Sequence, residues 1–208
     1  MTLRAHVHEL IARPAGNGRV VLVERDGEAT VDARLERPAL LPGSFNPLHH
    51  GHELLAEAAS AASGRAAVLE VSVANVDKPP LDVDEVLRRI AQFRGRWDVV
   101  LTRAPTFLEK GRLFPGATFV VGWDTAIRLV EPRYYGGPEA MAVALDELEG
   151  LGCRFVVGGR LAGEQFRTLA DIEMDARWSG MFEAIPEELF RADVSSTALR
   201  ADAAGNPA

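Results

Sequence analysis

Three of the five histidines in the chain fall within residues 49–52, where the sequence reads His-His-Gly-His. The cluster follows an apolar run that ends at Pro42, and it precedes a segment rich in alanine and leucine. Proline cannot donate to a sheet ladder, and alanine and leucine favour helices, so the cluster is expected where a strand gives way to a helix. Unpaired backbone N–H groups at a helix N-terminus favour an anion. The cluster therefore predicts a phosphate-binding site.

His49 and His52 are three positions apart and project to one side if the turn is helical. Their ring N–H groups would then donate hydrogen bonds to phosphoryl oxygens and stabilise the charge that develops during group transfer. Gly51 leaves room for a phosphate near the backbone, and Ser44 adds a hydroxyl donor at the end of the strand. Zinc binding is the alternative for clustered histidines, but the spacing is not that of a metalloprotease helix. Phosphate chemistry is the favoured interpretation.

A second polar segment, Val-Ser-Ser-Thr-Ala-Leu-Arg, lies at residues 194–200. With Ser195 as an N-cap, its hydroxyl groups would lie at the N-terminus of a helix. Arg200 would return to the same face as Ser196 and Thr197, so the segment is suited to gripping a phosphate. The alternative interpretation is a plain helix cap followed by a surface arginine.

Two further loops carry candidate residues. Asp124, in the Gly-Trp-Asp that ends an apolar run, either borders a nucleotide or caps the next helix. Lys78 follows another apolar run, and the two prolines after it stiffen the loop because their φ angles are fixed. It either reaches the phosphates or is an ordinary surface lysine. Weaker candidates for contacts with a second substrate are Lys110, Arg112 and Arg160.

The stretch Gly-Ser-Phe-Asn-Pro-Leu-His-His-Gly-His, residues 43–52, resembles the signature of the nucleotidyltransferase superfamily that carries the H-x-G-H motif. It is most similar to that of the nicotinate and nicotinamide mononucleotide adenylyltransferases, and residues 194–200 resemble their I-S-S-T-x-I-R motif. The resemblance implies transfer of AMP from ATP to a small phosphorylated acceptor, with release of pyrophosphate. It further implies direct in-line attack at the α-phosphorus and Mg²⁺ bound to the triphosphate, without direct metal ligands from the protein.

The resemblance also implies roles for individual residues. Catalytic roles fall to His49, His52, Ser44 and Lys78. Nucleotide binding falls to Gly43, Phe45, Gly51, Gly122, Asp124, Ser195, Ser196, Thr197 and Arg200. Acceptor binding falls to Trp123, Tyr134 and Arg160. Relatives that recognise a pyridine ring usually have a tryptophan after the G-x-D helix, where this chain has two tyrosines, and this departure leaves the acceptor in doubt.

From residue 38 onward, apolar runs alternate with helical patterns, as expected for parallel strands that are covered on both faces. We therefore predict an α/β fold: a Rossmann-like doubly wound parallel sheet with an N-terminal β-hairpin appendage. The expected division is a hairpin extension at 1–37 and a nucleotidyltransferase domain at 38–208. Asp26-Gly27 predicts a tight hairpin turn with both residues at positive φ. His6 and His8 are expected to be an ordinary solvated pair.

Composition and net charge limit the classes of molecule that the chain is expected to bind. The chain has 208 residues, 47% of them hydrophobic, and a net charge of −7, which disfavours nucleic acids and anionic membranes. No apolar stretch has the length of a transmembrane helix, and the N-terminus lacks a signal-peptide core, so a cytoplasmic protein is expected. The single cysteine, Cys153, excludes an intrachain disulfide and is expected in a buried strand.

Three functional alternatives stay open. The first keeps the reaction but changes the substrates, to CTP with an alcohol phosphate or to ATP with phosphopantetheine. The second is a non-catalytic nucleotide-binding module, with the hairpin as a partner surface. A zinc hydrolase is the least favoured. A homo-oligomer that pairs hairpin edges also stays open, although charged residues at this edge would oppose such pairing.

Overall fold

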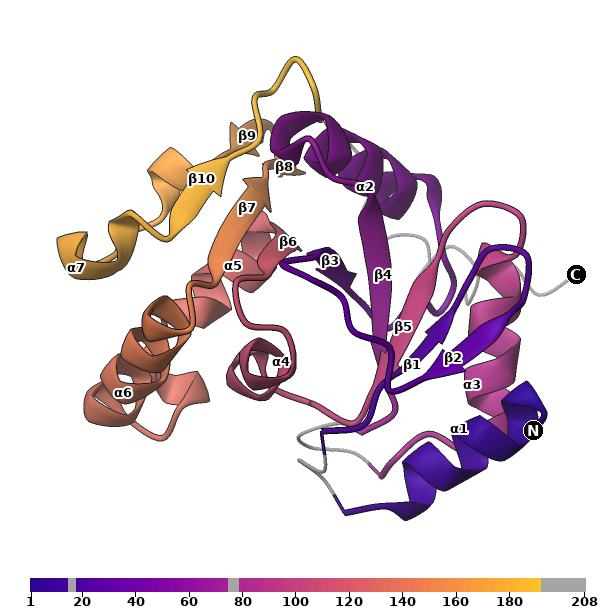
Figure 1. Ribbon diagram of the computed structural model, residues 1–208. Helices are drawn as coiled ribbons and strands as arrows, with labels where there is room; N and C mark the ends of the chain where they lie inside the picture. Colours follow the sequence, from indigo (N-terminus) through magenta and orange to yellow (C-terminus); the bar gives the residue numbers. More distant parts are fainter. Residues whose placement is uncertain (15–17, 75–78, 192–208) are drawn as a thin grey trace, which may run out of the picture.

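The computed structural model describes residues 1–14, 18–74 and 79–191 (Figure 1). The strands of its main sheet are β1 Val21–Val23, β2 Ala29–Val31, β3 Ala39–Pro42, β4 Ala67–Ser72, β5 Val99–Thr102, β6 Thr118–Gly122, β7 Arg154–Gly158 and β10 Phe182–Ala184. A separate small hairpin consists of β8 Arg160–Ala162 and β9 Gln165–Arg167. The helices are α1 Leu3–Ala12, α2 His50–Ser63, α3 Val83–Ile90, α4 Phe107–Leu113, α5 Trp123–Leu129, α6 Pro138–Gly150 and α7 Ala176–Ser179. Short 3₁₀ turns are η1 Ala91–Phe93, η2 Pro132–Tyr134 and η3 Leu169–Asp171.

The strand order of the main sheet is β10-β7-β6-β3-β4-β5-β1-β2. The six strands from β10 to β5 are parallel. The chain adds β4 and β5 on one side of β3 and then crosses to the other side, where it adds β6, β7 and β10. This reversal is the topological switch point of the sheet, and in such sheets the crevice that binds ligands lies there, outside the carboxyl ends of the adjacent strands β3 and β6. The predicted doubly wound sheet is confirmed.

Helices cover both faces of the sheet, which explains why its strands are continuous apolar runs. Along β3 and β6, neighbouring residues alternate between two cores: Leu41 and Val120 face one, Leu40 and Val121 the other. The first core takes its helical residues from α1, α2 and α3, and the second takes them from α5, α6 and α7. Cys153 is buried in the second core, as expected, but it lies directly before β7 and not in the strand itself.

The N-terminal hairpin is an edge addition to the sheet, as predicted, because β1 pairs antiparallel with β5 and β2 pairs with β1. The prediction for its turn is wrong in one respect: Gly27 has a φ of +97°, whereas Asp26 does not have a positive φ. The five-residue connection is built on a turn in which the Gly27 N–H donates to the Glu24 carbonyl at 2.8 Å. Such a turn needs positive φ only at its end, unlike a two-residue hairpin loop.

The sequence analysis missed a helix, α1, within the predicted extension. The Thr2 hydroxyl caps it by accepting from the Ala5 N–H, and Val7 and Leu10 are fully buried in the first core. His6 and His8 lie on this helix and not in the hairpin. Residues two apart on a helix do not share a face, which argues against a joint metal site.

A buried ion pair lies in the sheet near the crevice. Glu70 of β4, which is 1% exposed, accepts a hydrogen bond at 2.9 Å from Nζ of Lys110 on α4. The Thr102 hydroxyl and the Ala104 carbonyl complete the cluster as partners of Glu70 and Lys110 respectively. Glu70 is level with Pro42 at the end of β3, and its carbonyl accepts from the Gly43 N–H.

Removing only the cation from this cluster should be costly. Lys110→Met is expected to lower the free energy of unfolding by about 3–5 kcal/mol, because it leaves the Glu70 carboxylate buried without its counter-charge. The double variant Glu70→Leu with Lys110→Met should recover most of that loss. Urea unfolding measures both. Arg112→Ala is the control, because Arg112 lies on the same helix as Lys110 and its ion pair with Glu147 is exposed. This variant should change the free energy of unfolding little. Equal losses in the single and double variants would contradict the prediction.

Candidate nucleotide-binding site

The chain makes a sharp turn between β3 and α2, at the crevice. Phe45 is fully buried with a φ of +43°, and its ring lies against Gly43. A Cβ on Gly43 would lie 2.7 Å from that ring, so only glycine fits at this position. The helix that follows begins at His50, as predicted, with His49 as its N-cap.

His52 is the N3 residue of α2, and its ring is fixed by the backbone. The His49 N–H donates a hydrogen bond to Nδ1 of His52 at 3.3 Å. A neutral imidazole has one donor and one acceptor nitrogen, so this bond places the proton of neutral His52 on Nε2. The His52 ring stacks on the His49 ring, with 3.6 Å between centroids, and meets Phe45 edge-on at 4.9 Å. The two predicted histidines are therefore side by side.

Burial, with a smaller contribution from the neighbouring His49, lowers the pKa of His52 to about 4. His52 is therefore neutral near pH 7, and its Nε2–H is a neutral donor. Its exposed neighbour His50 lies 4.0 Å from Glu53, a carboxylate that also pairs with Arg96 at 2.6 Å. Of the three clustered histidines, His50 is the one whose side chain is 80% exposed.

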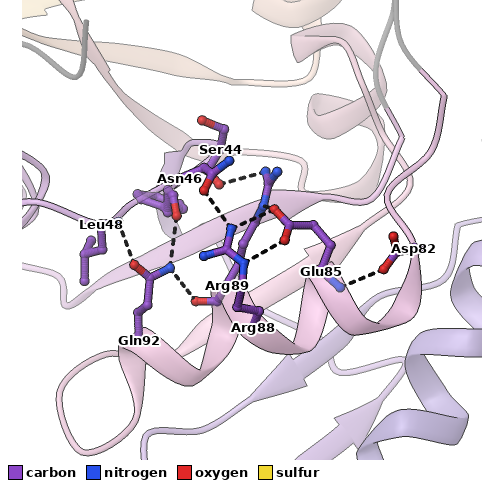
Figure 2. A network of polar contacts seen from close by, with 9 residues as sticks. Ser44, Asn46, Leu48, Asp82, Glu85, Arg88, Arg89 and Gln92 are labelled. Carbon is purple, nitrogen blue, oxygen red and sulfur yellow. Dashed lines mark hydrogen bonds and ion pairs between the residues drawn. The ribbon is translucent and has the colours of Figure 1, made fainter. Parts of the chain in front are cut away.

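The helix α3 holds the loop that leads to His49 (Figure 2). Nη1 of Arg89 donates to the Ser44 carbonyl at 2.9 Å, and Nη2 of Arg88 donates to Oδ1 of Asn46 at 2.6 Å. Both arginines pair with Glu85, and their hydrogen bonds lower the pKa of that carboxyl to about 2. Asp82 caps this helix by accepting from the Glu85 N–H. Arg88 and Arg89 are site residues that the sequence analysis missed.

Across the crevice, β6 and β7 end side by side, with Gly122 paired to Gly158. Asp124 and Arg160 each lie two residues beyond this pair, and they form an ion pair. The sequence analysis assigned Asp124 to the nucleotide and Arg160 to the acceptor, so the structure brings the two together. The alternative in which Asp124 caps the next helix is wrong, because Gly122 is the N-cap of α5 and the helix begins one residue before Asp124.

Gly158 lies against the helix that carries the histidines. A Cβ at Gly158 would lie 2.5 Å from Cδ1 of Leu55 and 2.8 Å from the ring of Phe190. The absence of a side chain here lets α2 pack closely on the end of β7. Since Leu55 is one helical turn beyond His52, the ends of β6 and β7 adjoin the turn that carries the histidines.

The remaining acceptor candidates are separated along α5. Trp123 begins the helix at the crevice, and its Nε1 is buried with no hydrogen-bond partner among the described residues. Tyr134 is half exposed in η2, beyond the other end of α5, with Arg128 and Arg133 over its ring. A seven-residue helix, about 10 Å long, separates the two aromatic residues. Tyr135 donates its hydroxyl to the Leu129 carbonyl, and burial raises its pKa to about 12.

Some predicted residues lie outside the described part of the chain, namely Lys78, Ser195, Ser196, Thr197 and Arg200. Two weaker candidates are accounted for by other contacts: Lys110 is buried against Glu70, so its predicted acceptor contact is wrong, and Arg112 pairs with Glu147. Within residues 1–14, 18–74 and 79–191, no group of three histidine, cysteine or acidic side chains is arranged to hold a metal ion. No helix in that part of the chain is both long and apolar enough to cross a membrane.

Comparison with protein families gives a match over most of the chain. The family described as cytidylyltransferase-like matches residues 40–202, which is well over half of the chain. The matched region begins within β3 and includes the histidine cluster, the Gly-Trp-Asp segment and residues 194–200. A search of curated proteins finds no match.

The depressed pKa of His52 predicts a pH-dependent stability. An unfolded histidine binds a proton below about pH 6.5, whereas buried His52 binds one only near pH 4. The contribution of His52 to the free energy of unfolding is therefore complete above pH 6.5 and is lost as the pH falls toward 4. The loss should reach roughly 2–3 kcal/mol. His52→Asn keeps an acceptor for the His49 N–H but cannot titrate, so its urea midpoint should fall less over this range. His8→Asn, at an exposed histidine, is the control. Parallel profiles for His52→Asn and the wild type would refute the assignment.

Proposed function

The chain belongs to the cytidylyltransferase-like family of nucleotidyltransferases, and we propose that it transfers AMP from ATP to a small phosphorylated acceptor and releases pyrophosphate. Nicotinate or nicotinamide mononucleotide is the proposed acceptor, on the resemblance of residues 43–52 to the adenylyltransferases of these nucleotides. The observation that carries the proposal is the hydrogen bond from the His49 N–H to Nδ1 of His52. It leaves a neutral Nε2–H donor at a helix N-terminus beside the crevice.

In this proposal the triphosphate lies over the N-terminus of α2. The free N–H groups of the first helical turn favour its negative charge, and Gly51 leaves the backbone accessible, whereas Gly43 admits the Phe45 ring that shapes the turn. Nε2 of His52 donates to a non-bridging oxygen of the α-phosphate, where charge increases in the transition state. His49, stacked on His52, is the second imidazole of the site. Ser44 and Lys78 assist from the adjoining loops.

The leaving pyrophosphate is assigned to residues 194–200. Ser195, Ser196, Thr197 and Arg200 would bind its oxygens. One observation on the described chain supports this assignment: Phe190 packs against Gly158 at the carboxyl end of β7, so the chain arrives at the crevice four residues before the segment begins.

The acceptor would enter between α2 and the ends of β6 and β7. There the Asp124–Arg160 pair and Trp123 offer a carboxylate, a guanidinium and an aromatic ring with a buried N–H donor. A guanidinium suits the phosphate of the acceptor, and an indole ring suits a flat base. Tyr134, at the other end of α5, is the less favourably placed of the aromatic candidates.

The proposed reaction needs no general base, because the attacking acceptor phosphate is already ionised. Catalysis then consists of positioning and electrostatic stabilisation. Mg²⁺ bound to the triphosphate would neutralise part of its charge. Such ions are typically held by substrate phosphates and water with few protein ligands.

Pyrophosphate release tests the proposal directly. ATP, CTP, GTP and UTP should each be paired with nicotinate mononucleotide, nicotinamide mononucleotide, phosphopantetheine and glycerol phosphate, and the products identified by mass. Release is expected with ATP and a pyridine mononucleotide. Release only with the pair of CTP and glycerol phosphate would show that these are the substrates and that ATP and a pyridine mononucleotide are not. Binding of ATP without release from any pair would favour a nucleotide-binding role over AMP transfer.

His52→Asn should lower kcat by about 10²–10³-fold, because it removes one preorganised donor to the transition state. The circular dichroism spectrum should be unchanged, because the introduced carboxamide can still accept from the His49 N–H. His50→Asn, at the exposed neighbour, is the matched control and should keep near wild-type turnover. Wild-type turnover in the His52 variant would end the catalytic assignment.

A further inference from the structure

The loop before His49 is also held by Gln92, in η1 directly after α3 (Figure 2). Nε2 of Gln92 donates to the Phe45 carbonyl and to the Arg89 carbonyl, both at 3.0 Å. Oε1 of Gln92 accepts from the Leu48 N–H at 2.9 Å. Only one orientation of the amide satisfies two carbonyls and one N–H together. Gln92 therefore ties two points of the loop, on either side of Asn46, to the end of α3.

Phe45 connects this amide to the histidines. Its positive φ is disfavoured for a residue with a side chain, so neighbouring contacts must hold it in place. The Gln92 amide holds its carbonyl, and the ring of the adjacent Phe93 meets its ring edge-on at 5.2 Å. The Phe45 ring also meets the His52 ring edge-on, with 4.9 Å between the ring centroids. Gln92 and Phe93 thus act on His52 through Phe45, without touching it.

We propose that Gln92 is a positioning residue for nucleotidyl transfer, because it fixes the loop and the Phe45 ring against which the donor face of His52 is set. The proposal deepens the proposed function and rests on it. Gln92 is half-buried, and within the described part of the chain its side chain hydrogen-bonds only this loop and the Arg89 carbonyl, so its loss should leave the sheet and both cores intact. The loop and the His52 ring should lose their fixed geometry.

Gln92→Met, which keeps the length of the side chain and removes all three hydrogen bonds, should lower kcat by about 10–100-fold. KM for the triphosphate should change much less, because the helix N-terminus and residues 194–200 remain. Val86→Ala is the matched control: Val86 is a fully buried core residue of the preceding helix α3, and its apolar side chain cannot hydrogen-bond the loop, so its truncation destabilises the protein while kcat is retained. An equal fall in kcat for both variants would show a merely structural role and overturn the proposal.

Gln92→Glu distinguishes a positioning role from a role in packing, because the effect of this substitution on kcat should depend on pH. The introduced carboxylate, when ionised, faces two carbonyl oxygens and cannot donate to them, whereas the protonated carboxyl donates to Phe45 and accepts from Leu48. The ratio of the kcat of this variant to that of the wild type should therefore rise as the pH falls from about 8 to about 5.5. The ratio for Gln92→Met should stay flat. A flat ratio for Gln92→Glu as well would contradict the assignment.

Two measurements need no turnover. Amide hydrogen exchange at Leu48 should accelerate in Gln92→Met, whereas in Val86→Ala it should keep its wild-type rate relative to the amides of α3. The ¹⁵N signals of the His52 ring should shift in the Gln92 variant alone. If the wild-type protein released no pyrophosphate with any substrate pair, the proposed function would fail, and these measurements would judge the Gln92 contact separately. An unchanged Leu48 exchange rate would overturn it.

Discussion

The hydrogen bond from the His49 N–H to Nδ1 of His52 is the interaction on which the rest of the site depends. It uses a backbone donor that every helix N-terminus leaves free, and it converts an otherwise ambiguous imidazole into one with a defined donor nitrogen. Burial keeps this ring neutral near pH 7. The same residue thus caps its helix and presents an N–H at the crevice, so local folding and chemistry cannot be separated at this position.

That bond is useful only because the surrounding backbone is rigid. Gly43 admits the Phe45 ring, and Phe45 supports His52. Arg89 of α3 and Gln92 of η1 hold the loop. The contacts of Arg89 and Gln92 come from α3 and η1, which follow β4 and lie more than thirty residues beyond the loop in the sequence. The loop is therefore held by contacts from residues far along the chain, as the proposed positioning of a triphosphate requires.

The buried Glu70–Lys110 pair lies at the same edge of the sheet and serves a different purpose. Both charges are enclosed by protein, and the Glu70 carbonyl accepts from the first N–H of the loop. Such a pair is costly to break from one side, so it ties α4 to the sheet beneath the crevice. The sequence leaves Lys110 open as a contact for a ligand, but in the structure its ammonium is buried against Glu70.

The sequence alone determined the order of strands and helices from residue 38 to the end of β7, because apolar runs and caps are local signals; the Asp82 cap and the start of α2 at His50 are examples. It also predicted phosphate chemistry for the cluster at residues 49–52 from residue types and spacing, and the structure brings the His49 and His52 rings together. It missed α1, α7 and the short strands β8, β9 and β10, because their patterns are brief and their stability comes from packing on distant elements. Only the tertiary structure decided which nitrogen of His52 donates, that Asp124 pairs with Arg160, and that Gln92 holds the loop. Each of these depends on backbone geometry or on a contact between residues that no local pattern relates.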